Sequence, residues 1–387
     1  MSSAPRPPAT NHARDALIQL LSMRGMGPRR LGLLLDGFGT PEAAVAAPTR
    51  QWRELGLPES VCHAAPDADK CDAIHAWLAA SDRHQLIGRN DPGFPERLRE
   101  LPDAPATLFC RGRIAALHDP QLAIVGSRTP TTGGRQNAFA FAEHLASQGL
   151  TITSGLALGV DSAAHRGALA AGGVTVAVLG SGPDRIYPPE NEALAGEIVA
   201  GGGLVVSEWL PGTGPKRGHF PRRNRLISGL SHGVLVVEAS LKSGSLITAR
   251  LAGEQARDVF AIPGSIHNPL ARGCHQLIRE GAKLVETGRD VLEELAPALD
   301  AYLPPVPPRA GPDDRDTTAP GPADADTATL DPDQQRILDL LGYDPQPADR
   351  LIEASGLTAA EVSSILLMLE LAGQVATLPG GLYARTS

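Results

Sequence analysis

The sequence predicts an α/β protein built around a doubly wound parallel sheet, with a helical domain before the sheet and a small domain of three helices and a hairpin after it. Short apolar runs alternate with segments of helical periodicity between residues 122 and 285. These runs are too apolar for strands with one face in water, so we expect helices on both faces of the sheet. Residues 12–82 and 331–387 show mainly helical periodicity.

The composition is that of a globular, acidic chain with several domains. Its 387 residues are 42% hydrophobic and carry a formal net charge of -8, so a large core is available and indiscriminate coating of nucleic acid is excluded. We expect a disordered tail over residues 1–11, a helical domain over 12–82, the α/β domain over 83–300 and a final domain over 331–387. Residues 301–330 are rich in Pro, Ala, Asp and Thr, which predicts a flexible linker.

Cysteine usage and hydropathy favour a cytoplasmic protein. The four cysteines form no Cys-x-x-Cys pair, and the N-terminus lacks the apolar core of a signal peptide. No run approaches the roughly 18 apolar residues that a membrane span needs. Cys62, Cys71 and His75 match no familiar zinc spacing. We expect no metal, no cofactor and no membrane span.

The first domain begins with two predicted helices, Arg14–Ser22 and Arg29–Leu35, joined by a Gly-x-Gly turn. This is the pattern of a helix-hairpin-helix, which can offer backbone N–H groups to a phosphate. The glycines can equally serve a plain helical connection, which we favour. We expect the helical region to reach about Ala80, with Trp52 and Trp77 in its core, and the Pro- and Gly-rich residues 86–112 to form an ordered connector without regular structure.

The central domain contains seven predicted strands and five predicted helices between them. The strands are Leu122–Val125, Leu150–Thr153, Val174–Leu179, Leu204–Val206, Val234–Val237, Val259–Ile262 and Lys283–Val285. The helices are Gly134–Ser147, Ser162–Ala171, Glu190–Val199, Ser245–Ala256 and Gly273–Glu280.

Small and polar residues follow the strands where a doubly wound sheet binds its ligands, at the carboxyl ends. Small residues let a ligand approach the backbone, and serines at helix starts present N–H and O–H groups to an anion. Each such loop is weak evidence alone, but several on one edge predict a phosphate pocket. The candidate residues are Ser127, Arg128, Ser154, Gly155, Ser243 and Ser245.

The segment Gly214–Ser231 reverses the local sign of charge. Between Lys216 and Arg225 it holds five cations, no acid and one aromatic residue, Phe220. We interpret the segment as a Gly/Pro loop with cations spaced around one aromatic residue. Guanidinium groups for phosphates and a ring for an unstacked base are what single-stranded nucleic acid requires. A solvated basic loop is the plain alternative. The candidate residues in this segment are Lys216, Arg217, Phe220, Arg222, Arg223, Asn224 and Arg225.

The sequence of the final domain predicts a winged helix. Asp333–Leu341, Ala348–Ala354 and Ala359–Ala372 have helical periodicity, with Thr358 as a cap supported by Glu361, and a Gly-Gly turn joins two short strands after them. The third helix has no Lys or Arg. Because a duplex reader needs cations for phosphates, we favour a protein-docking or structural role over DNA reading.

These residues together resemble a known family. The motifs are Gly126-Ser-Arg128, Ser154-Gly-Leu-Ala-Leu-Gly-Val-Asp161, Gly180-Ser-Gly-Pro-Asp-Arg-Ile-Tyr-Pro188, Phe220-Pro-Arg-Arg-Asn-Arg225, Val237-Glu-Ala-Ser-Leu-Lys-Ser-Gly-Ser245 and Gly273-Cys-His-Gln-Leu-Ile278. From about Leu86 to Leu295 the chain resembles the DNA-processing protein A family, also called DprA or Smf. The flanking modules match that family's three-part layout with weaker motifs.

The resemblance implies an extended Rossmann-like sheet that binds single-stranded DNA, dimerises, and helps to load the RecA recombinase during natural transformation. It implies a DNA pocket made by Arg128, Arg217, Phe220 and the Arg223-Asn224 pair. A structural role is the alternative for Arg223 and Asn224, which can also cap a helix and pair with carbonyls at the ends of the strands. His275 departs from the asparagine expected at its position, which leaves the shape of that loop open. We expect Arg128→Glu or Arg223→Glu to abolish single-strand binding with the fold intact, and deletion of residues 330–387 to leave most of the affinity.

The main alternative is a nucleotide-binding hydrolase of the phosphoribohydrolase type, whose Rossmann-like fold also binds phosphates at glycine-rich strand ends. The Pro-Gly-Gly-x-Gly-Thr loop of those enzymes is absent, and the acids Glu208 and Glu238 have no evident histidine partner. The first strand runs into Gly-Ser-Arg rather than a dinucleotide-binding Gly-x-Gly-x-x-Gly, and no Walker A loop is present. We therefore expect a protein that is not an enzyme.

Overall fold

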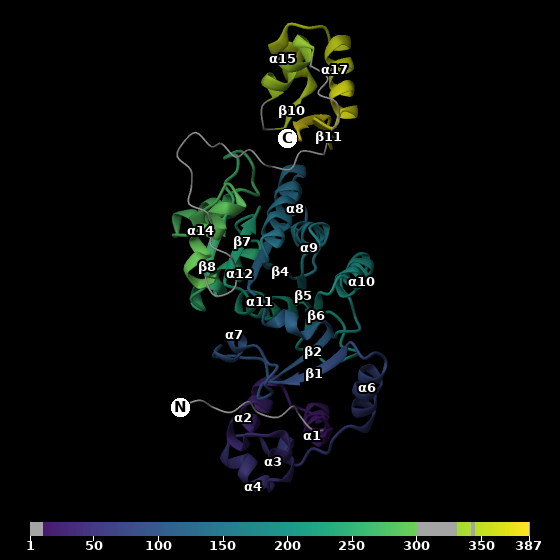
Figure 1. The fold of residues 1–387 in the computed structure, drawn as a ribbon, viewed down its shortest axis with the longest axis vertical. Helices are drawn as coiled ribbons and strands as arrows, with labels where there is room; N and C mark the ends of the chain where they lie inside the picture. Colours follow the sequence, from purple (N-terminus) through teal and green to yellow (C-terminus); the bar gives the residue numbers. More distant parts are fainter. Residues whose placement is uncertain (1–10, 300–330, 342–344, 387) are drawn as a thin grey trace. The chain divides into compact units, whose positions relative to one another are not determined.

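The computed structural model of this protein describes residues 11–299, 331–341 and 345–386. They group into a larger unit that holds the first two predicted domains and a smaller unit built mainly from the C-terminal residues. Each unit is described below by itself (Figure 1). The expected tail, apart from Asn11, and the expected linker lie outside the described residues.

The larger unit starts with a cluster of short helices that confirms the predicted helical region. Trp52 and Trp77 are buried in its core, and the Trp52 indole N–H donates to the Ala44 carbonyl at 2.9 Å. The turn between the first two helices contains Gly25 with φ 81°, a conformation that favours glycine. The helices are α1 (Asn11–Ser22), α2 (Pro28–Phe38), α3 (Pro41–Ala46), α4 (Thr49–Glu54), α5 (Glu59–Cys62) and α6 (Ala68–Ala79).

A nine-stranded sheet follows, and it confirms all seven predicted strands (Figure 1). The seven pair in parallel, and the order across the sheet is β1-β2-β6-β5-β4-β3-β7-β8-β9. The order reverses between β3 and β7, which is the switch point of a doubly wound sheet. These strands are β3 (Gln121–Gly126), β4 (Thr151–Ser154), β5 (Thr175–Val178), β6 (Leu204–Ser207), β7 (Gly233–Val237), β8 (Asp258–Ala261) and β9 (Lys283–Leu284).

The expectation of an irregular connector over residues 86–112 is wrong. β1 (His84–Gly88) and β2 (Thr107–Gly112) pair antiparallel, and β2 pairs antiparallel with β6, so both extend the sheet. The Pro- and Gly-rich residues lie between the two strands, around the short helix α7 (Glu96–Arg99). The apolar side chains of β1 and β2 contribute to the core of the helical cluster on one face and to the core of the central sheet on the other.

Helices cover both faces of the sheet, as expected for strands this apolar. Alternate residues of β3 show the two layers, because Ala123 and Val125 pack towards one set of helices and Leu122 and Ile124 towards the other. The first set contains α11 (His219–Leu230), α12 (Gly244–Glu254) and α13 (Arg272–Arg279). The second contains α8 (Thr132–Ser147), α9 (Val160–Ala170), α10 (Glu192–Ala200) and α14 (Gly288–Leu299).

The smaller unit has the predicted winged-helix plan. It contains α15 (Pro332–Leu341), α16 (Ala348–Ser355) and α17 (Ala359–Leu371), followed by the hairpin of β11 (Val375–Leu378) and β12 (Leu382–Arg385), which also pairs with β10 (Gln346–Pro347). The Thr358 hydroxyl and the Glu361 carboxylate form the predicted capping box. In the described chain no single helix is long and apolar enough to cross a membrane; α16 and α17 reach that measure only as a pair, bent by 116°.

Candidate nucleic-acid interface

The carboxyl ends of the parallel strands bring the predicted motifs to one edge of the sheet. Ser127 and Arg128 follow β3, Gly155 follows β4, Gly180 lies just beyond β5, and Glu208 follows β6. At the switch point the Ser127 N–H donates to the Glu238 carbonyl beyond β7 at 2.7 Å. The fold therefore assembles a common rim from loops that are far apart in the sequence.

The interpretation of the basic segment as a Gly/Pro loop is wrong beyond Gly218. Residues 219–230 form α11, and Lys216 and Arg217 lie exposed in the turn before it. The helix is compatible with Pro221 because a proline in the first helical turn removes no hydrogen bond. Its buried residues Arg223, Leu226, Ile227 and Leu230 recur at the helical spacing of three to four. The basic segment therefore divides into an exposed face and a buried face.

Arg223 lies on the buried face and ties α11 to the ends of two strands. It is 5% exposed, and its Nη1 donates to the carbonyls of Gly155, at 2.6 Å, and Val178. A Cβ on residue 155 would stand 2.4 Å from that nitrogen, so a side chain there would displace the Arg223 guanidinium. Burial lowers the pKa of Arg223 to about 10, and the nearby Asp161 opposes the shift, so the side chain stays cationic at neutral pH.

The burial of Arg223 alters one expectation from the sequence. A carboxylate at position 223 would face the Gly155 carbonyl and the buried Asp161, and the guanidinium that now lies beside both would be lost. Burying unpaired like charges costs several kcal/mol. Arg223→Glu therefore tests the fold rather than binding, whereas the exposed Arg128 remains suitable for charge reversal.

Arg225 is also buried, and it is neutralised. Its Nη2 donates to the Glu208 carboxylate at 2.7 Å and its Nε lies 3.0 Å from Asp103. Glu208 is almost fully buried and also meets the half-exposed Arg222 at 3.3 Å. Although the segment itself contains no acid, the fold supplies two. We expect Arg225 to stabilise the fold rather than to contact a phosphate.

Phe220 forms an aromatic centre on the rim. The guanidinium of Arg128 lies over its ring, 5.8 Å from the centroid, and the Tyr187 ring lies 5.6 Å away at 46°. Gly180 permits this arrangement, since a Cβ there would stand 2.8 Å from the Phe220 ring. Phe220 is half-buried and Tyr187 is exposed. An aromatic ring beside a free guanidinium offers one base a stacking surface and its phosphate a cation.

A second aromatic group, missed by the sequence analysis, flanks α11. Trp209 stacks on His219 with ring centroids 3.7 Å apart, and the Arg222 guanidinium lies 5.4 Å from the Trp209 centroid. Burial lowers the pKa of His219, which keeps the ring neutral at physiological pH. The only signal in the sequence was the position of Trp209 three residues after a predicted strand. This stack fixes Arg222 and His219 at the start of α11.

The predicted serines and Asn224 have mainly local partners. The Ser154 hydroxyl is buried and donates to the Ile124 carbonyl at 2.6 Å, and the Ser127 hydroxyl accepts from the Thr129 N–H at 3.2 Å. Ser243 caps α12 and its hydroxyl lies 2.6 Å from that of Ser245. The Asn224 amide donates to the Gly244 carbonyl at 3.3 Å, which connects α11 to the start of α12.

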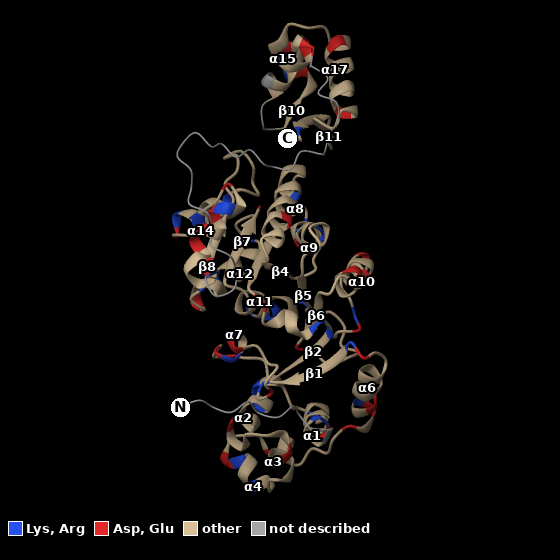
Figure 2. Ribbon diagram, viewed as in Figure 1, with Lys and Arg blue, Asp and Glu red and all other residues tan. Residues whose placement is uncertain are grey.

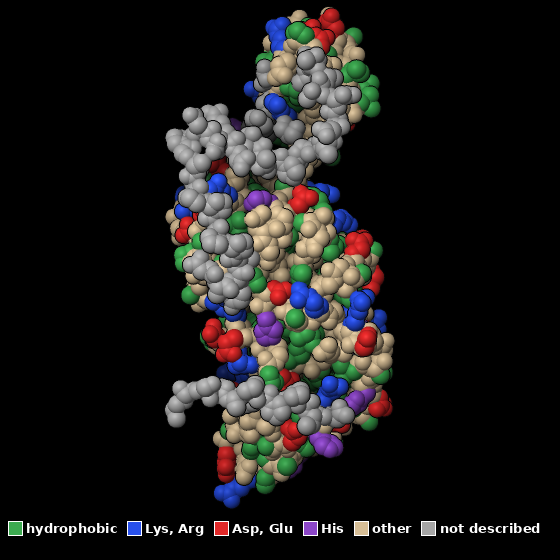
Figure 3. Space-filling model, viewed as in Figure 1, with side chains coloured by type: hydrophobic (Ala, Val, Ile, Leu, Met, Phe, Trp, Pro, Cys, Tyr) green, Lys and Arg blue, Asp and Glu red, His purple; other side chains and the backbone are tan. Residues whose placement is uncertain are grey.

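Exposed cations remain around Phe220 once the buried ones are removed from the predicted set. Among the described residues, Lys216, Arg217 and Arg128 form no salt bridge, and Arg222 shares Glu208 with Arg225. Figure 2 shows the Lys and Arg positions along α11. Elsewhere on the face seen in Figure 3, acidic and basic side chains are interspersed. The rim is thus a local cationic surface on an acidic protein.

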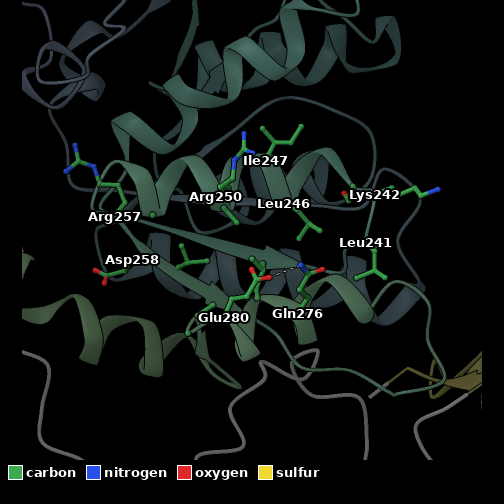
Figure 4. A pocket seen from close by; sticks show the side chains of 16 residues that line it. Leu241, Lys242, Leu246, Ile247, Arg250, Arg257, Asp258, Gln276 and Glu280 are labelled. Atoms are coloured by element: carbon green, nitrogen blue, oxygen red, sulfur yellow. Dashed lines mark hydrogen bonds between the residues drawn. The ribbon is translucent and has the colours of Figure 1, made fainter.

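A cavity lies between α12 and α13, beside β8 (Figure 4). Of the predicted site residues only Ser243 lines it. It measures about 820 Å³ and combines apolar Leu241 and Leu246 with Arg250, Glu280 and other charged residues. Gln276 donates to Glu280 at 2.7 Å within it. The unusual His275 on α13 contacts the Gly264 carbonyl at 3.0 Å. Within the described ranges no group of three His, Cys, Asp or Glu side chains could hold a metal ion.

Fold and rim together define a doubly wound α/β protein that carries an aromatic, cationic edge at the carboxyl ends of its parallel strands. The model of DNA recombination-mediator protein A matches residues 85–296, more than half of the chain, and the DprA winged-helix domain matches residues 321–381. The chain therefore belongs to the DprA/Smf family.

Relatives of known name agree with this assignment. Protein Smf of Escherichia coli is 44% identical over 311 residues, which cover 80% of this chain and 79% of that protein. DNA processing protein DprA of Streptococcus pneumoniae is 49% identical over 204 residues, 53% of this chain and 72% of the relative.

Two solved structures are also similar. DprA of S. pneumoniae has a TM-score of 0.62 at 38% identity and covers 74% of this chain and 99% of its own. DNA processing protein A of Helicobacter pylori, whose structure is described as giving insight into a single-stranded DNA binding mode, has a TM-score of 0.50 at 32% identity. That match covers 56% of this chain and 97% of the other.

Proposed function

We propose that this protein binds single-stranded DNA along the rim formed by Arg128, Phe220 and the turn before α11. The observation that carries the proposal is the pairing of the exposed Arg128 guanidinium with the Phe220 ring at the edge of the sheet. Duplex DNA hides its base faces, so an accessible ring favours an unpaired strand.

We assign different roles in strand binding to the residues of the rim. Arg128, Lys216, Arg217 and Arg222 attract successive phosphates, while Phe220 stacks on a base, which is worth about 1–3 kcal/mol. Arg223 holds the start of α11 against the ends of β4 and β5, so that Phe220 and Arg222 keep their positions when the strand arrives. We assign the serines and Asn224 to shaping the same loops, with Ser127, Ser243 and Ser245 close to the backbone that a phosphate would approach.

Similarity to the DprA proteins supports a role in processing DNA during natural transformation, with loading of RecA and formation of a homodimer as the finer steps that we propose. We also propose that the protein acts in the cytoplasm and is not an enzyme. The hydrolase alternative is less well supported, because Glu208 is engaged by two arginines and the Glu238 carboxylate accepts from Asn268 at 3.1 Å. Neither acid is placed to activate water.

The smaller unit fits a protein-docking role better than DNA reading. Its α17 contains no Lys or Arg, and Leu367, Met368 and Leu371 on that helix are each more than half exposed. An apolar surface of this kind suits a protein partner rather than a phosphate backbone.

Charge reversal at Arg128 tests the proposed site. Arg128→Glu should remove binding of oligo(dT) in a mobility-shift assay, since it replaces a cation beside Phe220 with an anion. Arg166→Glu, which reverses an exposed arginine in the middle of α9, is the matched control and should bind normally. Wild-type affinity for the Arg128 variant, or equal losses for both variants, would place the strand elsewhere.

A further inference from the structure

A second cavity of about 440 Å³ lies where the end of α6, the β1–β2 pair and the loop after β5 meet. Trp77, Arg83, His84 and Arg111 line one part of it, and Pro183 and Asp184 contribute from the loop. Its volume lies within the range typical of small-molecule pockets. None of the residues predicted for the rim lines it.

Two arginines give the cavity an uncompensated positive charge. Arg111 on β2 lies directly opposite His84 on β1, so their side chains share one face of the sheet. Arg83 immediately precedes β1, and its Nη1 donates to the Val199 carbonyl at 3.2 Å. Across the described residues, no carboxylate lies within ion-pair distance of either guanidinium.

Asp184, which also lines the cavity, has its partners in its own and a neighbouring loop. One Asp184 oxygen accepts from the Gly212 N–H at 2.8 Å, and the other lies 3.7 Å from Arg185. Asp184 is therefore held by its own loop and does not neutralise Arg83 or Arg111. Two guanidinium groups with open donors are suited to a phosphate, which accepts several charge-assisted hydrogen bonds.

A rigid aromatic wall borders these arginines. The Trp77 and His84 rings stack with centroids 4.3 Å apart and planes 4° apart, and the His84 Nδ1–H donates to the Trp77 carbonyl at 2.7 Å. This bond fixes the orientation of the imidazole. The stack shields one side of the cavity from water, and an ion pair is stronger where water is excluded.

The loop after β5 connects this cavity with the rim. Gly180 lies against the Phe220 ring at one end of the loop, and Pro183 and Asp184 line the cavity a few residues later. Four residues span at most about 14 Å. Since phosphates along one strand of a duplex recur every 3.4 Å or so, and no more closely in an extended strand, the cavity lies within about four nucleotides of the base at Phe220.

We propose that this cavity is a second phosphate site, which holds the backbone of the single strand after it leaves Phe220. The inference rests on the proposed function of the rim and extends it by a continuation of the strand over β1 and β2. The N-terminal helical cluster then shapes the binding surface through Trp77, and Arg111 and Arg83 bind the phosphate.

The length of the bound oligonucleotide provides the test. Fluorescence anisotropy is measured with oligo(dT) of about 2 nucleotides, which is too short to extend from Phe220 into the cavity, and of about 20 nucleotides, which exceeds the site size of a single-strand binding fold. Arg111→Gln should weaken binding of the longer strand about tenfold, as expected for a lost charge-assisted hydrogen bond, and leave the shorter strand unchanged. It should also reduce the slope of log affinity against log salt by about 0.7, which a merely structural role would not do.

Companion variants separate the possible results. Arg83→Gln, at an exposed position, should also weaken binding of the longer strand, and it serves as the test variant if Arg111→Gln lowers the melting temperature. Arg111→Lys should retain most of the affinity. Equal affinities of wild type and both glutamine variants for the longer strand would overturn the proposal. Failure of the wild type to bind either strand would instead refute the proposed function of the rim.

A last arm tests whether the phosphate comes from the strand. Inorganic phosphate and dTMP are titrated in a thermal-shift assay with wild type and Arg111→Gln. If the cavity binds the strand, Arg111→Gln should lower the affinity for the longer oligonucleotide and not for the shorter one. If Arg111→Gln abolishes a shift caused by phosphate or dTMP but leaves every oligonucleotide affinity unchanged, the cavity serves a free phosphate compound and our assignment to the strand is wrong.

Discussion

Substitution of Arg225 by glutamine should destabilise the protein strongly, although its neighbours in the sequence are proposed to bind DNA. Arg225 and Glu208 are 4% and 1% exposed in their side chains and lie 2.7 Å apart. Removing one partner of a buried ion pair leaves a buried charge, at a cost of about 3–5 kcal/mol. Glu208 would keep Arg222 at 3.3 Å, so we expect about 3 kcal/mol.

Urea unfolding followed by tryptophan fluorescence measures this loss. All three tryptophans, Trp52, Trp77 and Trp209, belong to the larger unit, so the signal reports on that unit. Arg250→Gln is the matched control, because its pair with Glu254 is exposed and is worth at most about 1 kcal/mol.

A double variant tests the stated cause. Arg225→Gln combined with Glu208→Gln should be more stable than Arg225→Gln alone, because no unpaired buried carboxylate remains. Two results would refute the buried ion pair as the support of α11. One is a loss below about 1 kcal/mol for Arg225→Gln, and the other is a double variant whose loss equals the sum of the losses measured for the two single variants.

Three other outcomes follow from the structure. Phe220→Ala should weaken oligo(dT) binding by about 1–3 kcal/mol, or about 5- to 150-fold, in fluorescence anisotropy, and unchanged affinity would exclude stacking on this ring. Deleting residues 330–387 should reduce single-strand affinity less than about tenfold in the same assay, since α17 carries no cation; a larger loss would assign DNA contacts to the smaller unit. His165 is buried, and because Thr175 donates to the Ile152 carbonyl, the His165 Nδ1–H must donate to Thr175 and Nε2 carries no proton. Burial lowers the pKa of His165 to about 3, below its unfolded value near 6.5, so the unfolded chain binds the proton first and stability falls as the pH drops from 6.5 towards 3. Between pH 7.5 and 5 this histidine should cost about 2 kcal/mol, and chemical unfolding of His165→Gln should show a correspondingly weaker pH dependence; identical pH profiles would contradict this.

The sequence predicted the parallel strands well because each carries its own signal. Seven apolar runs separated by helical segments leave little choice of fold, and the structure confirms all seven. β1 and β2 were missed because the prolines and glycines between them dominate the local pattern. β2 joins the sheet by pairing with β6, almost a hundred residues later, and no local pattern reveals such a partner.

The division of the basic segment could not be predicted from composition. Arg222, Arg223 and Arg225 look equivalent in the sequence, but helical geometry places Arg222 on the exposed face and turns the other two inwards. The partners of the buried pair, the Gly155 carbonyl and Glu208, come from distant strand ends. Periodicity within residues 219–230 was the available signal, and Pro221 obscured it by suggesting a loop.

A salt titration of single-strand and duplex binding tests the central claim most directly. If Arg128, Lys216, Arg217 and Arg222 each neutralise one phosphate, log affinity for oligo(dT) should fall against log salt with a slope of about -3. Because Phe220 needs an unpaired base, a duplex of the same length should bind much more weakly at every salt concentration. Equal affinity for both forms, or a single-strand affinity that does not depend on salt, would contradict the proposed rim.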